Sequence, residues 1–293
     1  MYSEDLKKID PYIISNQIKK DGYFFYNEAL DKDFLNKILS EANLEYQINF
    51  NDNLPVNFFG QKFNTSILAT SLSCYNLITD EKVRKVSKLV LGENFRLKAQ
   101  RYYESGYKYR LGWHTDNKTV SGGMTGSNGI VFIYYLCDTF DGQLEGIEGS
   151  HKFSSLTKKN SFTDDEINKS YSNNVRSFPG KAGSLIITHT HLIHGTKIIK
   201  DKKFRRKSIF FQIDDDMENA EKKYINPAFM TNHSNEILNF LGVGMPDNYS
   251  CVPQSNIRTA SNTFLLIHFY KIILELLKRI FKLKDIKKKI SKK

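Results

Sequence analysis

Cysteine is scarce in this sequence. The 293 residues contain only Cys74, Cys137 and Cys251, and no two of them are spaced as Cys-x-x-Cys. An odd number without paired spacing argues against a disulfide framework and a thiolate zinc site, and it favours a reducing compartment. The N-terminus also lacks a basic region followed by an apolar run, so we expect no secretory signal and a cytoplasmic location.

The sequence also lacks an uninterrupted apolar segment long enough to span a membrane. The nearest candidate is 264–283, whose length would suffice for a spanning helix. Its apolar side chains favour insertion by about 6 kcal/mol, whereas its five charged residues oppose insertion by over about 10 kcal/mol. Those charged residues are Lys271, Glu275, Lys278, Arg279 and Lys282. A transmembrane helix is therefore not expected.

The same segment has the pattern of an amphipathic helix. Its apolar residues form one stripe, at positions 265, 269, 272, 273, 276, 280 and 283. Lysines follow at 287–289 and 292–293, so 264–293 is predicted to lie on an anionic membrane surface. The alternative is a helix docked on its own domain or on a dimer partner. We accordingly divide the chain into a domain over 1–258 and a basic C-terminal tail over 259–293.

The net charge outside this tail is small, only +3, because basic and acidic residues there nearly balance. The whole chain carries a net charge of +11, but 261–293 alone hold ten basic and two acidic residues. A protein that acts on nucleic acid should carry its charge around the functional cleft. We therefore expect no nucleic-acid partner.

The pattern of apolar residues predicts helices first and short strands afterwards. An apolar fraction of 40% and an aromatic fraction of 13% are typical of a folded globular protein. Helices are predicted over 5–20, 31–43 and 79–91, with Thr79 as the cap of the last and Gly92 as its stop. Strands are predicted at 95–103, 129–136, 183–188 and 208–213. This order indicates an α+β, mainly β, jelly roll (double-stranded β-helix) over about 95–215, with helices packed on one face.

Two polar segments about eighty residues apart are typical of a metal site. The first contains His114 and Asp116, and side chains two apart on a strand face the same way. The second supplies His194, which can complete a set of two nitrogens and one carboxylate oxygen. That set, with open positions left over, suits non-haem Fe(II) that activates O2. Further on, Arg206 and Ser208 offer a two-pronged donor and a hydroxyl on one strand face, which fits a dicarboxylate such as 2-oxoglutarate.

A third element lies between these segments, namely Gly-Gln-Leu at 142–144 and Gly-Ser-His-Lys at 149–152. It follows Trp-His-Thr-Asp at 113–116 and precedes His-Gly-Thr at 194–196. This order of three motifs resembles that of the phytanoyl-CoA dioxygenase-like family of Fe(II)/2-oxoglutarate oxygenases. The entry Asp-Gly-Tyr at 21–23 is also similar to this family. The resemblance covers roughly residues 10–215. One departure is Glu148, which stands where the family has proline.

The resemblance implies a cofactor set and residue roles. His114, Asp116 and His194 would bind iron, and Arg206 would bind the C5 carboxylate of 2-oxoglutarate, with O2 as the other cosubstrate. Thr196 stands where the family has Ser or Thr near the cosubstrate. Because related halogenases have a small residue in place of the aspartate, Asp116 favours hydroxylation or a related oxidation. The expected substrate is a small molecule, or a lipid or sugar-type compound if the tail lies on a membrane.

Several alternatives stay open from the sequence. Arg205 adjoins Arg206, although it would share its strand face with Lys207, which repels a carboxylate. A zinc or manganese site built with His189 and His191 is conceivable, as is a non-catalytic binding protein attached to a membrane or partner through its tail. The glycine-rich stretch 121–129 is interpreted as a mobile loop over the iron site or as an exposed hairpin connection.

Overall fold

The computed structural model describes most of the region before the tail. The described residues are 1–42, 61–64, 67–116, 128–153, 159–215, 223–230, 234–243, 249–250, 269–270 and 273. The predicted loop over 121–129 and the predicted tail helix over 264–293 therefore lie largely outside them. Within the described part, no helix is both long enough and apolar enough to cross a membrane.

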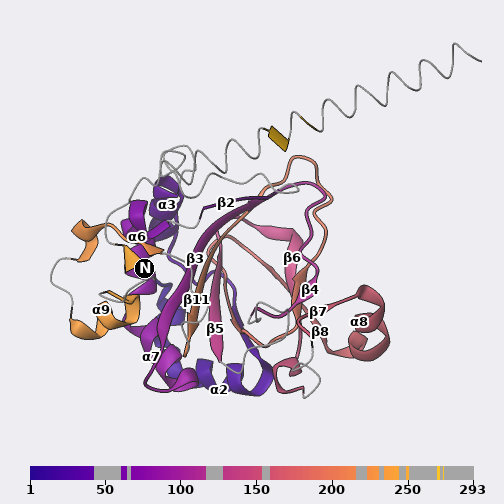
Figure 1. Ribbon diagram of the computed structural model, residues 1–293, viewed down its shortest axis with the longest axis horizontal. Helices are drawn as coiled ribbons and strands as arrows, with labels where there is room; N and C mark the ends of the chain where they lie inside the picture. The colour runs from indigo at the N-terminus through magenta and orange to yellow at the C-terminus, as the bar shows by residue number, and fades with distance from the viewer. Residues whose placement is uncertain are drawn as a thin grey trace, which may run out of the picture.

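Two antiparallel sheets form the centre of the described fold (Figure 1). The six-stranded sheet has the order β1 (Tyr23–Tyr26), β9 (Leu185–His189), β5 (Gly129–Tyr135), β11 (Arg206–Asp214), β3 (Arg96–Ser105), β2 (Gln61–Asn64). The five-stranded sheet has the order β7 (Ser161–Phe162), β4 (Trp113–His114), β10 (His194–Thr196), β6 (Thr139–Ile147), β8 (Val175–Gly180). A short parallel pair, β12 (Lys223–Tyr224) with β13 (Tyr249–Ser250), lies outside both sheets. The predicted jelly roll is confirmed.

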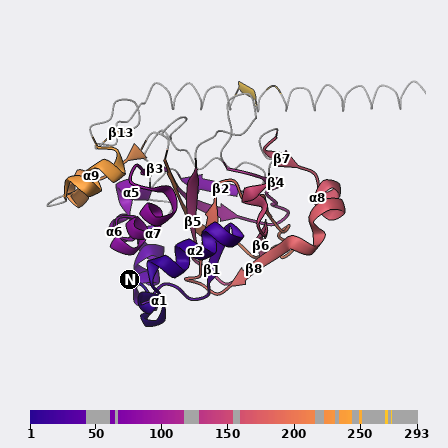
Figure 2. The same cartoon turned by 90° about the horizontal axis from the view of Figure 1, so that it is seen from below.

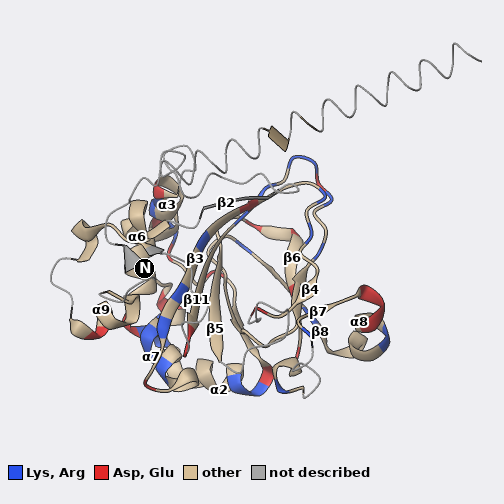
Figure 3. Cartoon of the chain, viewed as in Figure 1, with Lys and Arg blue, Asp and Glu red and all other residues tan. Residues whose placement is uncertain are grey.

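Helices cover the outer face of the six-stranded sheet (Figure 2). They are α1 (Glu4–Lys8), α2 (Pro11–Asp21), α3 (Lys32–Glu41), α5 (Ile67–Thr70), α6 (Leu72–Ile78), α7 (Glu81–Leu91) and α9 (Asn235–Leu241). A further described helix, α8 (Asp164–Tyr171), packs beside the five-stranded sheet and has an acidic first turn, red in Figure 3. Three short 3-10 turns complete the described elements, at Ser150–Lys152, Ser172–Asn174 and Pro227–Met230.

Strand alternation separates the main core from the interior between the sheets. On β11, Ile209, Phe211 and Ile213 are fully buried and join the hydrophobic cluster formed with the helices. The intervening side chains, including Ser208 and Phe210, point into the space between the two sheets. One strand therefore supplies both the apolar core and the wall of an internal cavity.

Two helix predictions need correction, one in its middle and one at its start. The helix predicted over 5–20 is broken, because Pro11 has no N–H to donate and Asp10 before it adopts an extended conformation that caps α2. The cap of α7 is Asp80, whose carboxylate accepts from the Lys82 N–H at 2.8 Å. Thr79 instead ends α6, where its hydroxyl donates to the Tyr75 carbonyl.

Candidate active site

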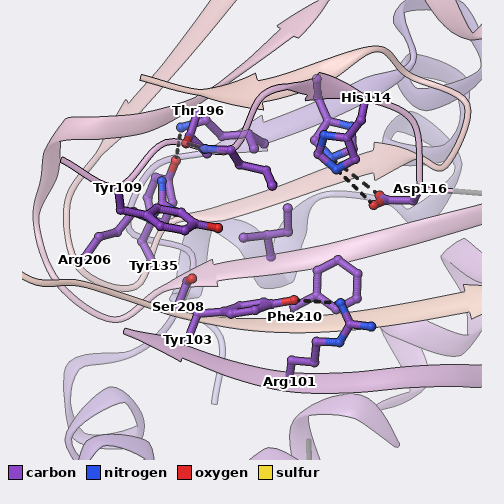
Figure 4. Close-up of a pocket in the computed structure, with 14 residues that line it drawn as sticks. Arg101, Tyr103, Tyr109, His114, Asp116, Tyr135, Thr196, Arg206, Ser208 and Phe210 are labelled. Carbon is purple, nitrogen blue, oxygen red and sulfur yellow. Dashed lines mark hydrogen bonds and ion pairs between the residues drawn. The ribbon is translucent and has the colours of Figure 1, made fainter. Parts of the chain in front are cut away.

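A cavity of about 450 Å³ lies between the two sheets (Figure 4). The six-stranded sheet supplies one wall through β3, β5 and β11, and the five-stranded sheet supplies the other through β4, β6 and β10. Tyr109 and Leu111, from the connection between β3 and β4, close one side. All six residues predicted for the site line this cavity: His114, Asp116, His194, Thr196, Arg206 and Ser208.

The predicted metal ligands lie together on the five-stranded sheet. His114 on β4 and His194 on β10 are directly opposite in the antiparallel register, with ring centres 4.3 Å apart. Asp116 follows β4, and its N–H donates to the Thr190 carbonyl at 2.9 Å. Its carboxylate oxygens lie 3.7 Å from His114 Nε2 and 3.6 Å from His194 Nε2. Sheet pairing thus joins residues that are about eighty positions apart.

Backbone carbonyls orient both imidazole rings. His114 Nδ1 donates to the Gly112 carbonyl at 2.8 Å, and His194 Nδ1 donates to the Leu192 carbonyl at 2.9 Å. These bonds place the ring proton on Nδ1 and leave each Nε2 lone pair directed toward Asp116, as metal-binding histidines require. Burial lowers the pKa of His194, which favours its neutral, ligating form.

Asp116 is suited to hold a cation. Its Oδ2 is buried without a hydrogen-bond partner, an arrangement that is costly unless a positive group approaches it. Burial acts to raise the pKa of Asp116, but the facing His194 and His114 outweigh burial and lower it. Two imidazoles and one carboxylate, with the cavity open beside them, form a donor set that fits Fe(II).

Arg206 lies at the other end of the cavity and is only 6% exposed. Its guanidinium donates to the Gly142 carbonyl and, more weakly, to Ser105 Oγ at 3.4 Å. Arg205, by contrast, is exposed and donates to the carbonyls of Lys202 and Phe204. Of these two adjacent arginines, Arg206 is therefore the one that faces the cavity.

The two predicted hydroxyl residues lie near this end. Thr196 Oγ1 accepts from the Leu111 N–H at 2.9 Å, so it also fixes the connection that closes the cavity. Ser208 lines the cavity on the same face of β11 as Arg206. The Arg-x-Ser spacing thus predicted correctly that the two side chains share a face.

Three other described histidines, His151, His189 and His191, lie outside this cavity. His189 Nδ1 accepts from the His191 N–H at 3.1 Å, and His151 Nε2 donates to the Lys19 carbonyl at 3.1 Å. Within the described ranges, His114, Asp116 and His194 form the one cluster with three ligand atoms close enough to share a metal, all within 4.8 Å of one another. A zinc site that includes His189 or His191 is not supported.

Sequence reasoning missed part of the cavity wall. Arg101, Tyr109, Tyr135 and Phe210 all line the cavity, and none was predicted there. Phe210 continues the two-residue alternation of Arg206 and Ser208, so periodicity on β11 could have identified it. Tyr109 lies in an irregular connection, where no periodic pattern indicates which way its side chain points. Tyr103, which is half-buried, also lines the cavity.

A family comparison agrees with this geometry. The family model described as phytanoyl-CoA dioxygenase matches residues 18–207, which include all the ligands above and Arg206. The chain belongs to the phytanoyl-CoA dioxygenase family. As a member of this family, it is an Fe(II)- and 2-oxoglutarate-dependent oxygenase, and O2 is its other cosubstrate. A search of curated proteins found no significant match.

Solved structures similar to this family member share its fold. EctD from S. alaskensis, crystallised with 2-oxoglutarate and 5-hydroxyectoine, has a TM-score of 0.57 at 17% identity, covering 73% of this chain and 78% of EctD. The carbocyclase SnoK of nogalamycin biosynthesis has a TM-score of 0.57 at 12% identity, covering 72% of this chain and 85% of SnoK. HygX from Streptomyces hygroscopicus, with nickel, 2-oxoglutarate and hygromycin B bound, has a TM-score of 0.53 at 15% identity, covering 69% of this chain and 86% of HygX.

Proposed function

We propose that this protein hydroxylates a small-molecule substrate while converting 2-oxoglutarate and O2 to succinate and CO2. In this proposal His114, Asp116 and His194 hold the iron, and Arg206 binds the distal carboxylate of 2-oxoglutarate with Ser208 and Thr196 beside it. A cavity of about 450 Å³ has the size of a small-molecule site, typically about 300–1,000 Å³.

One observation carries the proposal: a triad of metal ligands and a buried arginine face each other along a single cavity. The triad leaves coordination positions open, and Arg206 supplies a charge-assisted, two-pronged contact for a carboxylate. A dicarboxylate anchored at Arg206 can extend toward the triad. A structural metal would need neither the open cavity nor the arginine.

The protein's residues would contribute positioning. Iron, when bound, supplies the sites at which O2 is activated. The Gly112 and Leu192 carbonyls keep both Nε2 atoms aimed at one point, and burial of His194 keeps it free of a competing proton. Apolar side chains such as Phe210, Ile133 and Leu144 exclude water and bring a substrate C–H bond close to the metal centre.

The proposal is tested by anaerobic titration with Fe(II) and 2-oxoglutarate, followed by a screen for succinate release over candidate substrates. We expect one Fe(II) per chain. His114→Ala and His194→Ala should abolish iron-dependent 2-oxoglutarate turnover while circular dichroism shows an intact fold. His191→Ala, which leaves the cavity unchanged, is the control and should retain turnover. Full turnover by either ligand variant would rule out the proposed triad.

A further inference from the structure

Tyr135 lines the cavity beside Arg206 (Figure 4). It belongs to β5 of the six-stranded sheet, but its hydroxyl bonds to two strands of the five-stranded sheet. The hydroxyl accepts from the Leu144 N–H on β6 at 2.9 Å and donates to the Phe178 carbonyl on β8 at 3.2 Å. A side chain of one sheet thus joins two strands of the other.

This hydroxyl bridge lies where the β6–β8 ladder is interrupted. Leu144 and Phe178 are opposite each other in the antiparallel register, but the next paired residue of β6 is Thr139. Four residues of β6, 140–143, therefore lie opposite one residue of β8, Pro179. Because proline has no N–H to donate to a ladder, strands accommodate it at a sheet edge or at a bulge. The extra residues of β6 form such a bulge.

The bulge contains the carbonyl that holds Arg206. Gly142 has a φ of +67°, a left-handed conformation that favours glycine, and its carbonyl accepts from the Arg206 guanidinium. The Asp141 carboxylate anchors the bulge from outside, because it accepts from the N–H groups of Lys200 and Asp201 at 2.8 and 2.9 Å. Gly142 thus lies between this anchored point and the hydroxyl bridge.

The Tyr135 hydroxyl has no proton left for a ligand. A phenol donates one hydrogen bond, and Tyr135 gives its proton to the Phe178 carbonyl. Burial raises the pKa of Tyr135 to about 12, so the hydroxyl stays protonated at neutral pH. Since a carboxylate only accepts hydrogen bonds, Tyr135 is not placed to bind 2-oxoglutarate directly. Any effect of this hydroxyl on the cosubstrate passes through the backbone that it holds.

We propose that Tyr135 is a positioning residue for Arg206: its hydroxyl fixes the end of the bulge and thereby the Gly142 carbonyl that orients the guanidinium. Without the hydroxyl, the buried Leu144 N–H and Phe178 carbonyl lose this partner, and closing on each other would satisfy both. Closure shifts the bulge and moves the Gly142 carbonyl away from Arg206. The guanidinium is then held less well toward the distal carboxylate of 2-oxoglutarate. This inference rests on the proposed function, because it takes Arg206 as the anchor of that carboxylate.

The test compares two adjacent buried tyrosines of β5. The Tyr134 hydroxyl lies 3.4 Å from the Tyr2 hydroxyl, in the main core on the other face of the strand. Calorimetry measures binding of Fe(II) to the full-length protein and then anaerobic binding of 2-oxoglutarate to the iron-loaded protein. We expect Tyr135→Phe to weaken 2-oxoglutarate binding about fivefold, the effect of one orienting hydrogen bond, and to leave Fe(II) affinity within about twofold. Tyr134→Phe, the matched control, should change neither affinity, and melting temperatures check the folding of both.

A double variant shows whether Tyr135 acts through Arg206. In the Arg206→Ala background, Tyr135→Phe should cause no further loss of 2-oxoglutarate affinity, because the group that it positions is gone. Losses that add in the double variant would overturn the inference, and so would wild-type affinity in Tyr135→Phe. If the wild type does not bind 2-oxoglutarate, or if Arg206→Ala binds it equally well, the proposed function fails and the inference with it.

Two glycines test the same bulge with Tyr135 intact. A Cβ at Gly142 would overlap Ile199, so Gly142→Ala has to move the carbonyl that Arg206 uses. Gly149 also has a positive φ, +76°, but a Cβ there meets nothing within 4 Å. Gly142→Ala should therefore weaken 2-oxoglutarate binding, and Gly149→Ala, its matched control, should not. Equal affinity of the two glycine variants for 2-oxoglutarate would show that the bulge does not position Arg206.

Discussion

Arg205 and Arg206 are adjacent in sequence but occupy opposite surroundings, because successive strand residues face opposite ways. Arg206 is buried in the cavity, and the exposed Arg205 packs its guanidinium against Gly106. If Arg206 anchors 2-oxoglutarate, its charge should matter for cosubstrate affinity while that of Arg205 should not. The pair thus offers a test in which two like residues differ only in direction.

We predict that Arg206→Ala weakens 2-oxoglutarate binding at least tenfold, because loss of a charge-assisted contact to a carboxylate costs about 2–4 kcal/mol. Arg205→Ala is the matched control and should stay within about threefold of the wild type. Anaerobic titration of the iron-loaded protein measures both, with melting temperatures to check folding. A larger effect at Arg205 would show that the anchor has been assigned one residue too late.

A buried ion pair restricts one position on β5 to glycine. Lys98 and Asp214 form this pair at 2.7 Å, and Gln212 Nε2 donates to both Asp214 oxygens at 3.1 Å. Burial raises the pKa of Asp214 to about 6, so the carboxylate depends on these partners. A Cβ added at Gly129 would overlap the Asp214 carboxylate and lie 2.8 Å from Thr190 Cγ2.

Gly129→Ala is therefore expected to lower the free energy of unfolding by about 1–3 kcal/mol, the usual cost of overpacking. Gly112→Ala is the control, since a Cβ there meets nothing within 4 Å, and it should change stability by about 0.5 kcal/mol or less. Urea unfolding followed by circular dichroism compares them. Equal stability of the two variants would contradict the steric account.

At the scale of elements, α8 supports the strand that carries the first metal ligand. Asp164, in its first turn, accepts from the Arg110 guanidinium and from Trp113 Nε1 at 3.0 Å. Trp113 directly precedes His114, and Arg110 lies between cavity-lining Tyr109 and Leu111. The Asp164 carboxylate thus joins α8 both to β4, through Trp113, and to the connection between β3 and β4, through Arg110.

Asp164→Ala should change stability little, because exposed ion pairs contribute about 0.2–1 kcal/mol. It should nevertheless weaken Fe(II) binding several-fold, less than the roughly 10–100-fold losses typical of groups that bond to a metal ligand directly, because Asp164 acts through Trp113. Asp165→Ala, in the same turn, is the control and should bind iron normally. The positioning role would be refuted if both variants bound Fe(II) as the wild type does, or if both lost affinity equally.

Elements were predictable from sequence where local chemistry decides them. Asp31 caps α3 at the start of the helix predicted over 31–43, with its side chain accepting from the N–H groups of Asp33 and Phe34, and Gly92 ends α7 as predicted. The errors arose where two neighbours compete for one role, as with Thr79 and Asp80. Strand ends also moved, and β11 begins at Arg206 rather than at 208, because pairing with β3 extends it. Tertiary pairing of this kind leaves no local signal.

At the scale of the whole molecule, the cavity combines predictable and unpredictable parts. The triad and Arg206 were predictable, because metal and carboxylate chemistry restricts the residue types and their order. The position of Arg101 was not, since an arginine on a strand is ordinarily solvent-exposed and only the closure of two sheets turns it inward. The parts of the cavity wall that no motif marks are therefore those that depend most on the complete fold.

The basic C-terminal tail is distant in sequence from the residues that line this cavity. Apart from 269–270 and 273, residues 264–293 lie outside the described structure, so the predicted membrane-surface helix stays a prediction. It depends on one apolar stripe and on the ten basic residues after position 260. Every residue assigned to the cavity lies before position 211. Membrane attachment and catalysis should therefore be separable.

We predict that the full chain co-sediments with anionic vesicles at low salt and dissociates at high salt, because the lysines act through a screened field. A truncation after residue 258 should lose vesicle binding, stay soluble and still bind Fe(II) and 2-oxoglutarate. Neutral vesicles are the control for apolar insertion alone. If the tail is instead a helix docked on its own domain, truncation exposes an apolar face and the shortened protein aggregates. Equal vesicle binding by the full and truncated chains would exclude a membrane role for 264–293.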